Sequence, residues 1–121
     1  MRRRFFAFWL ALGFASFGSS VQAAELVMLE QGGCVWCERW NQEIGVAYDK
    51  TEEGRKAPLR RVDIHQKWPD DLTGVRPERV TPTFILVEKG QEIARLRGYP
   101  GEHFFYPMLT EMLGKLPSAT N

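Results

Sequence analysis

The order of apolar and polar positions from residue 24 onward predicts strands that alternate with helices. Short apolar runs at Ala24–Leu29 and Phe84–Val87 are typical of strands buried in the centre of a sheet. A further strand is expected over Pro58–Ile64, and a glycine turn at Glu88–Gln91 leads into a partner strand over Glu92–Leu96. The pattern therefore predicts one sheet of about four strands.

Two longer segments have the spacing of helices that bury one face. The first runs from Cys34 to about Asp49 and the second covers Glu102–Leu116, where Pro107 either bends the helix or marks its first regular turn near Tyr106. The segment Lys67–Glu78 is expected to be a loop with at most a short helix near Asp70–Leu72. The expected buried faces are Trp40, Ile44 and Ala47 or Tyr48 in the first helix, and Phe105, Leu109, Met112, Leu113 and Leu116 in the second. This order of elements indicates the α/β class.

The first 23 residues have the features of a secretory signal peptide. Arginines follow Met1, an almost wholly apolar run covers Phe5–Phe17, and Val21–Ala23 fits a small-x-small cleavage pattern. The apolar run is short for a membrane span of about 20 residues, although an uncleaved anchor is the alternative. We therefore expect a leader at 1–23, one domain at 24–121, location in the periplasm and no stable membrane insertion after cleavage.

Charge adds little to this picture. The whole chain has a formal net charge of +1, and cleavage after Ala23 would remove three arginines and no acid, which leaves about −2. No basic patch indicates nucleic acid or a membrane surface as a partner.

The candidate chemistry lies in the sequence Cys34-Val35-Trp36-Cys37, which contains both cysteines of the chain. A glycine turn precedes it and a helix is expected to start there, so unpaired backbone N–H groups and the positive helix end would favour a thiolate at Cys34. Cys37 lies nearly one turn later on the same side, where it can resolve a mixed disulfide on Cys34. The pair is therefore a candidate redox couple.

Other uses of the two cysteines are weaker. A structural disulfide across two residues would close a very small loop and gain little entropy. A zinc site would need two more ligands, and the chain offers only His65 and His103 as histidines. Haem attachment needs a histidine after the second cysteine, where this chain has Glu38. We expect no cofactor and no metal.

Two neighbours of the cysteines have open roles. Glu30 is a candidate proton acceptor for Cys37, or else a solvated charge at the end of a strand. Trp36 either shields the sulfur atoms by packing or contacts a partner protein.

The chain resembles the thioredoxin family over about Ala24–Leu116. The resemblance rests on Cys34-Val35-Trp36-Cys37, on Val80-Thr81-Pro82-Thr83 before a strand, and on Gly98 after the hairpin. It implies a mixed sheet flanked by helices, with Cys34 as the attacking thiol and Cys37 as the buried resolving thiol.

The same resemblance assigns a partner-binding surface. It implies that Pro82 is a cis-proline facing the cysteines, that Thr81 offers its backbone to an extended partner segment, and that Gly98 leaves room for that segment. Trp36 and Tyr99 would form an apolar rim. The chain departs from many thioredoxins at Met28, where they have a buried aspartate, and at the Val-Trp pair between the cysteines, where they often have Gly-Pro.

A closer resemblance is to the exported thioredoxin-like proteins called SoxS. It is carried by the segments around Leu26–Met28, Glu30–Trp40, Ala57–Ile64, Thr81–Phe84 and Gly98–Glu102. The resemblance implies a thiol–disulfide oxidoreductase of bacterial sulfur oxidation, acting on protein thiols or disulfides that include a Sox carrier protein, with an upstream membrane electron donor. The alternative is a non-catalytic module of the same fold that binds a metal or a partner protein. The direction of electron flow does not follow from these residues.

Overall fold

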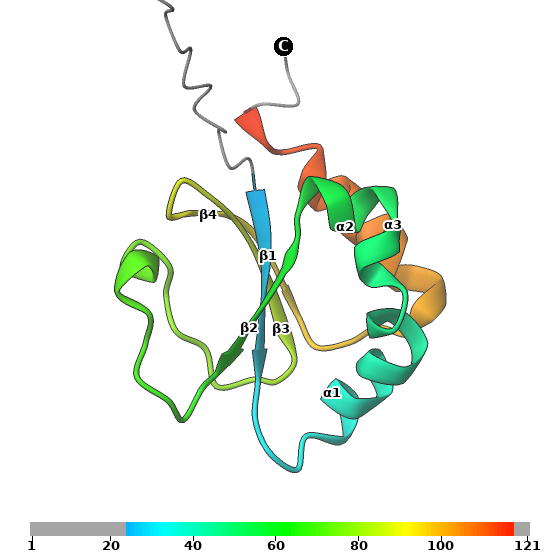
Figure 1. Cartoon of the computed structure of the whole chain (residues 1–121), viewed down its shortest axis with the longest axis horizontal. Helices are drawn as coiled ribbons and strands as arrows, with labels where there is room; N and C mark the ends of the chain where they lie inside the picture. The colour runs from blue at the N-terminus through cyan, green and yellow to red at the C-terminus, as the bar shows by residue number, and fades with distance from the viewer. Residues whose placement is uncertain (1–23, 118–121) are drawn as a thin grey trace, which may run out of the picture.

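The structure is a computed structural model that describes residues 24–117. The expected leader at 1–23 lies outside the described residues (Figure 1). The strands are β1 (Ala24–Glu30), β2 (Leu59–Asp63), β3 (Thr83–Glu88) and β4 (Gln91–Arg97). The helices are α1 (Val35–Trp40), α2 (Glu52–Lys56) and α3 (Glu102–Leu113), with a π-helical turn η1 (Asn41–Gly45) and 3-10 turns η2 (Tyr48–Lys50) and η3 (Asp70–Leu72).

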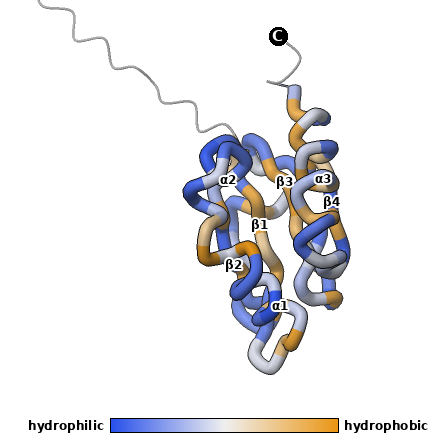
Figure 2. Tube along the Cα trace, turned by 90° about the vertical axis from the view of Figure 1, so that its right-hand side faces the viewer, coloured by the Kyte–Doolittle hydropathy of each residue, from blue (hydrophilic) through white to orange (hydrophobic). Residues whose placement is uncertain are grey.

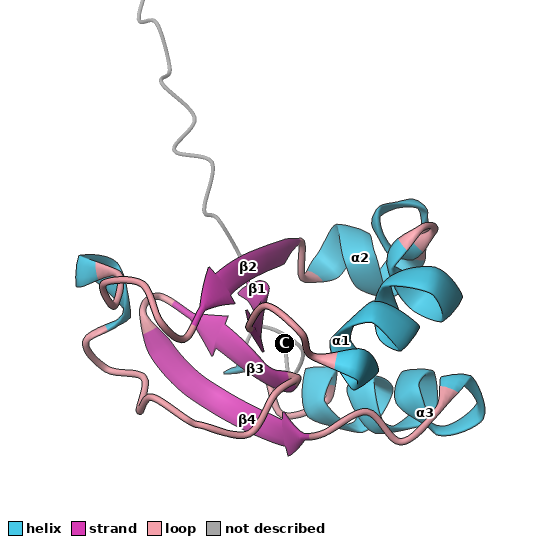
Figure 3. Cartoon of the chain, turned by 90° about the horizontal axis from the view of Figure 1, so that it is seen from below, coloured by secondary structure: helices cyan, strands magenta, loops and turns pink. Residues whose placement is uncertain are grey.

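The four strands form one mixed sheet in the order β2-β1-β3-β4, in which β1 pairs parallel with β2 and the other two pairings are antiparallel. The helices α1, α2 and α3 cover one face, and the long connection that contains η3 lies on the other (Figure 3). The predicted α/β class, four strands and short helix near Asp70–Leu72 are confirmed. No helix within residues 24–117 is both long and apolar enough to span a bilayer.

Alternating side chains of the two central strands build two apolar layers, and the traces of β1 and β3 are correspondingly hydrophobic (Figure 2). The layer under the helices contains Leu26, Met28, Phe84 and Leu86 with Trp40, Ile44, Tyr48, Phe105 and Leu109. The layer under the η3 connection contains Val27, Leu29, Ile85 and Val87 with Leu72 and Val75. Both faces of β1 and β3 are thus buried, which explains their continuous apolar runs.

The prediction of a single helix from Cys34 to about Asp49 is wrong in detail. The α-helix ends at Trp40, and the chain widens into η1 before it tightens into η2. A Cβ atom at Gly45 would lie 3.0 Å from the Trp40 ring, so the indole packs directly against this glycine. Of the side chains expected on the buried face of this segment, Trp40, Ile44 and Tyr48 are buried, whereas Ala47 is exposed.

The last helix is already formed at Glu102, so it does not begin near Tyr106. The Phe105 N–H donates to the Gly101 carbonyl, and the Phe105 ring is fully buried, which fixes the first turn on the core. Pro107 lies inside the helix.

Strand β2 is an edge strand whose two arginines face opposite sides of the sheet. Arg60 contacts Glu25 and Asp71, while Arg61 contacts Glu30 and Asn41. Their charged groups bind neighbouring elements at both faces, which explains why this strand lacks a clear apolar alternation.

The glycine at position 54 provides a test of the packing between α2 and η2. An added Cβ atom would overlap the Tyr48 carbonyl oxygen, although Gly→Ala inside a helix ordinarily stabilises. We expect Gly54→Ala to lower the free energy of unfolding by about 1–3 kcal/mol, measured by urea denaturation. Gly32→Ala is the matched control, because nothing lies within 4 Å of its added Cβ atom. Equal stability of the two variants would contradict this packing.

Candidate active site

Both cysteines lie where β1 passes through a short glycine turn into α1. Gly33 has φ +74°, a conformation that side-chain-bearing residues rarely adopt, and Cys34 follows it as the N-cap of α1. Cys34 and Cys37 are joined by a disulfide with their Cα atoms 5.2 Å apart, so the structure represents the oxidised pair.

The two sulfur atoms differ in access and in surroundings. Cys34 is partly exposed, whereas Cys37 is only 4% exposed and belongs to the core beneath the helices. The Cys37 backbone N–H donates to Cys34 Sγ at 3.2 Å. In the reduced protein such an N–H at a helix start favours a thiolate at Cys34 over a thiol.

The segment before β3 meets the turn before Cys34. The Thr81–Pro82 peptide bond is cis, Pro82 is buried, and Thr81 Oγ1 accepts a hydrogen bond from Gln31 Nε2 at 2.8 Å. Gly98 N–H donates to the Pro82 carbonyl at 2.7 Å. No atom lies within 4 Å of a Cβ built on Gly98, so the space beside this glycine is open.

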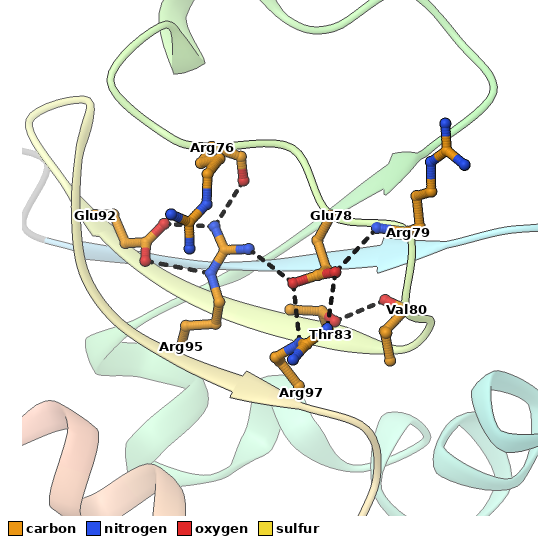
Figure 4. A network of polar contacts seen from close by, with 8 residues as sticks. All are labelled: Arg76, Glu78, Arg79, Val80, Thr83, Glu92, Arg95 and Arg97. Carbon is orange, nitrogen blue, oxygen red and sulfur yellow. Dashed lines mark hydrogen bonds and ion pairs between the residues drawn. The ribbon is translucent and has the colours of Figure 1, made fainter.

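The loop that leads into Thr81 is held against β4 by charged contacts. Figure 4 shows the Glu78 carboxylate between Arg95 and Arg97, at 3.4 Å and 3.0 Å. The Arg95 guanidinium also contacts Glu92 and donates to the Arg76 carbonyl oxygen. Since Arg95 is largely buried, this network fixes the loop before the Thr81–Pro82 segment.

The two aromatic side chains of the predicted rim differ in exposure. Trp36 is 53% exposed, and the Arg39 guanidinium lies 5.5 Å from the centre of its ring. Tyr99 is only 9% exposed and packs edge-on to Phe105, with its hydroxyl donating to Glu43. The role of Tyr99 as a contact for partners stays a prediction.

Glu30 lies at the end of β1 and is bound to an arginine. Its carboxylate accepts from Arg61 at 2.7 Å, and the same guanidinium donates to Asn41 and lies 3.8 Å from Met28 Sδ. Met28, in the position of the family's aspartate, is fully buried. The role of Glu30 as proton acceptor for Cys37 stays a prediction.

The structure shows a row of side-chain hydrogen bonds next to the cysteine helix that the sequence analysis did not predict. Arg39 donates to Glu43 at 2.7 Å, and Glu43 also accepts from the Tyr99 hydroxyl. These hydrogen bonds, first that of Tyr99 and then that of Arg39, hold the pKa of the Glu43 carboxyl below its ordinary value of 4.5. Burial raises the pKa of the Tyr99 hydroxyl. The four-residue spacing of Arg39 and Glu43 in the sequence could have indicated this ion pair.

Among residues 24–117, no group of three or more His, Cys, Asp or Glu side chains is placed to hold a metal ion. His65 is exposed and lies beside Gln31, and His103 is exposed at the start of α3.

Several solved structures are similar to this chain in fold. The chain is similar to the periplasmic thioredoxin SoxS of Paracoccus pantotrophus, with 46% identity and a TM-score of 0.73 over 76% of this chain and 97% of that one. It also matches Fasciola hepatica thioredoxin, with 20% identity and a TM-score of 0.56 over 74% of this chain and 81% of that one. Trxlp of Edwardsiella tarda matches at 23% identity and a TM-score of 0.56, over 72% and 82%. The last two matches establish the fold alone.

No protein-family model matches the chain, and no curated protein matches it either.

The hydrogen bond from Tyr99 to Glu43 leads to a titration prediction. In Tyr99→Phe the pKa of Glu43 should rise toward 4.5, because the first cause of its depression is removed while the ring still packs. Because the pKa of Glu43 is lower in the folded protein than in the unfolded chain, its ionised carboxylate stabilises the fold at pH values above the unfolded-state pKa. This contribution is lost as the pH falls through the folded-state pKa. The variant should therefore lose stability relative to the parent near neutral pH and match it in acid. Carboxyl titration by NMR measures the shift, with Arg39→Leu as a second variant that removes the other donor. An unchanged Glu43 midpoint in Tyr99→Phe would refute the assignment.

Proposed function

This chain belongs to the family of SoxS-type thioredoxins, and we propose that it keeps the thiol of a sulfur-carrier protein reduced in the periplasm. It is a thiol–disulfide oxidoreductase. The observation that carries the proposal is the placement of Cys34, which is accessible at the start of a helix with the buried Cys37 one turn behind it.

The proposed reaction transfers two electrons from the two cysteines to a partner disulfide. The Cys34 thiolate attacks one partner sulfur, a mixed disulfide forms, and the other partner sulfur leaves as a thiolate that takes up a proton. Cys37 then loses its proton and attacks Cys34 Sγ. This forms the Cys34–Cys37 disulfide and releases the second partner thiol. An upstream membrane dithiol donor restores the reduced pair by the reverse exchange.

The partner segment is proposed to lie along Thr81 and Pro82, beside the open space at Gly98. The exposed Trp36, 53% accessible, supplies an apolar surface next to the sulfur atoms, and Tyr99, 9% exposed, is the second proposed aromatic contact. Support for this placement comes from the hydrogen bond between Gln31 and Thr81, which joins the cysteine turn to the proline segment. Glu30 is the proposed acceptor for the proton of Cys37.

A reducing role is supported by the residues between the thiols. Val35 and Trp36 carry no positive charge that would stabilise the Cys34 thiolate further and make the pair strongly oxidising. The predicted leader at 1–23 and the similarity to a periplasmic protein support the proposed location.

Exchange of either cysteine tests the proposed order of attack. With insulin as substrate and dithiothreitol as reductant, Cys34→Ser should fall to the rate of dithiothreitol alone, since the attacking sulfur is lost. Cys37→Ser should form a mixed disulfide on Cys34 that does not resolve, visible as a mass increase that dithiothreitol reverses. Full turnover by Cys34→Ser would eliminate the mechanism.

Trapping in the native cell tests the proposed partner. The full chain with Cys37→Ser should accumulate a disulfide-linked complex with a sulfur-carrier protein, identified by mass spectrometry of bands that a reductant removes. The double variant Cys34→Ser/Cys37→Ser is the matched control and should trap nothing. Recovery of only unrelated partners would reject the sulfur-carrier role and leave the oxidoreductase activity standing.

A further inference from the structure

A cleft opens between the loop that leads into Thr81 and the residues that follow β2. It has a volume of about 570 Å³, and its lining residues are Gln31, Ile64, His65, Pro77, Glu78 and Arg79. We call it the Arg79 cleft. Gln31 forms part of its wall and also donates to Thr81, so the cleft borders the proposed path of the partner.

The charged side chains that line the Arg79 cleft are those of Glu78 and Arg79. Glu78, its acidic lining residue, is bound to Arg95 and Arg97, which offset its charge. Arg79 contributes only its backbone N–H to that network, and its guanidinium points away from it (Figure 4). No acidic side chain within residues 24–117 pairs with the Arg79 guanidinium, which is therefore available to a ligand.

The opposite wall of the cleft is held in place by Gln31. Its Oε1 lies 2.9 Å from His65 Nε2. The Asp63 carboxylate is committed to the His65 backbone N–H and does not line the cleft.

The chain between the cleft and the active site is exposed. Arg79 is exposed, Val80 is 39% exposed, and Thr81 follows at the site itself. An extended polypeptide advances about 3.3 Å per residue, so a partner segment beside Thr81 reaches the level of Arg79 within about two or three residues.

We propose that the Arg79 cleft binds the carboxylate of an aspartate or glutamate that lies a few residues from the reacting cysteine of the partner protein. The inference rests on the proposed function, because it uses the path of the partner along Thr81. A guanidinium binds a carboxylate through two parallel hydrogen bonds, so Arg79 would select acidic over neutral side chains at this distance. Exposed ion pairs contribute modestly, which corresponds to a preference of about two- to five-fold.

Matched synthetic peptides test this selection. Each peptide carries one cysteine as a mixed disulfide with 2-thiopyridine, and glutamate or glutamine occupies positions two or three residues before or after that cysteine. The reduced protein attacks the peptide sulfur through Cys34 and releases neutral pyridine-2-thione, whose absorbance gives the second-order rate constant. The wild-type protein should react about two- to five-fold faster with the glutamate peptide on one side of the cysteine, and added salt should reduce the ratio.

Variants of Arg79 assign the preference to its charge. The glutamate-to-glutamine rate ratio should fall to about one in Arg79→Gln, invert in Arg79→Glu and persist in Arg79→Lys. Arg55→Gln is the matched control, because Arg55 is an exposed arginine of α2 at the far end of the sheet (Figure 1), and its ratio should equal that of the wild type. Equal rates for both peptides with wild-type protein, or a preference that survives in Arg79→Gln, would overturn the inference. A wild-type protein that releases no thione from either peptide would instead contradict the proposed function.

Discussion

The active site depends on the antiparallel register between β1 and β3. Leu29 lies opposite Thr83 and Met28 opposite Phe84, and all four residues are fully buried. A slip of one residue would exchange the side chains of a strand between the two apolar layers and take Phe84 out of its ring contacts with Trp40 and Phe105, so the packing of the layers favours this pairing. The end of β1 and the start of β3 consequently lie at the same edge of the sheet. The cysteine turn and the Thr81–Pro82 segment extend from these two ends, and the Gln31–Thr81 hydrogen bond joins them.

The indole of Trp40 attaches the cysteine helix to this sheet. It lies three residues after Cys37, is fully buried, and has its ring 5.2 Å from that of Phe84 and 5.7 Å from that of Phe105. Phe84 follows the Thr81–Pro82 segment by only two residues. One aromatic cluster therefore positions both halves of the site, and a change in the core would be felt at the sulfur atoms.

Much of this arrangement could be predicted from local patterns. Continuous apolar runs identified β1 and β3 because both of their faces are buried, and the spacing of Phe105, Leu109 and Met112 identified α3 because one face packs on the core. The cysteine spacing indicated redox chemistry because one helical turn brings two thiols together. The π-helical widening after Trp40 was not predictable, since the apolar spacing of Trp40, Ile44 and Tyr48 also fits an unbroken α-helix. The two-sided arginine contacts of β2 were not predictable because their partners lie on other elements.

The sequence by itself determined most of the strands and helices, the family resemblance and the two redox cysteines, because each element and each motif is recognised from residues that are near one another in the chain. Only the tertiary structure decided which of those elements meet. It placed Gln31 against Thr81, 50 positions apart, and buried most of Tyr99 against Phe105. Among residues 24–117 it left Arg79 without an acidic partner, while Glu78 was held by Arg95 and Arg97. The physical reason is that burial and charge pairing depend on three-dimensional neighbours, which the register of the sheet selects and the local pattern does not encode.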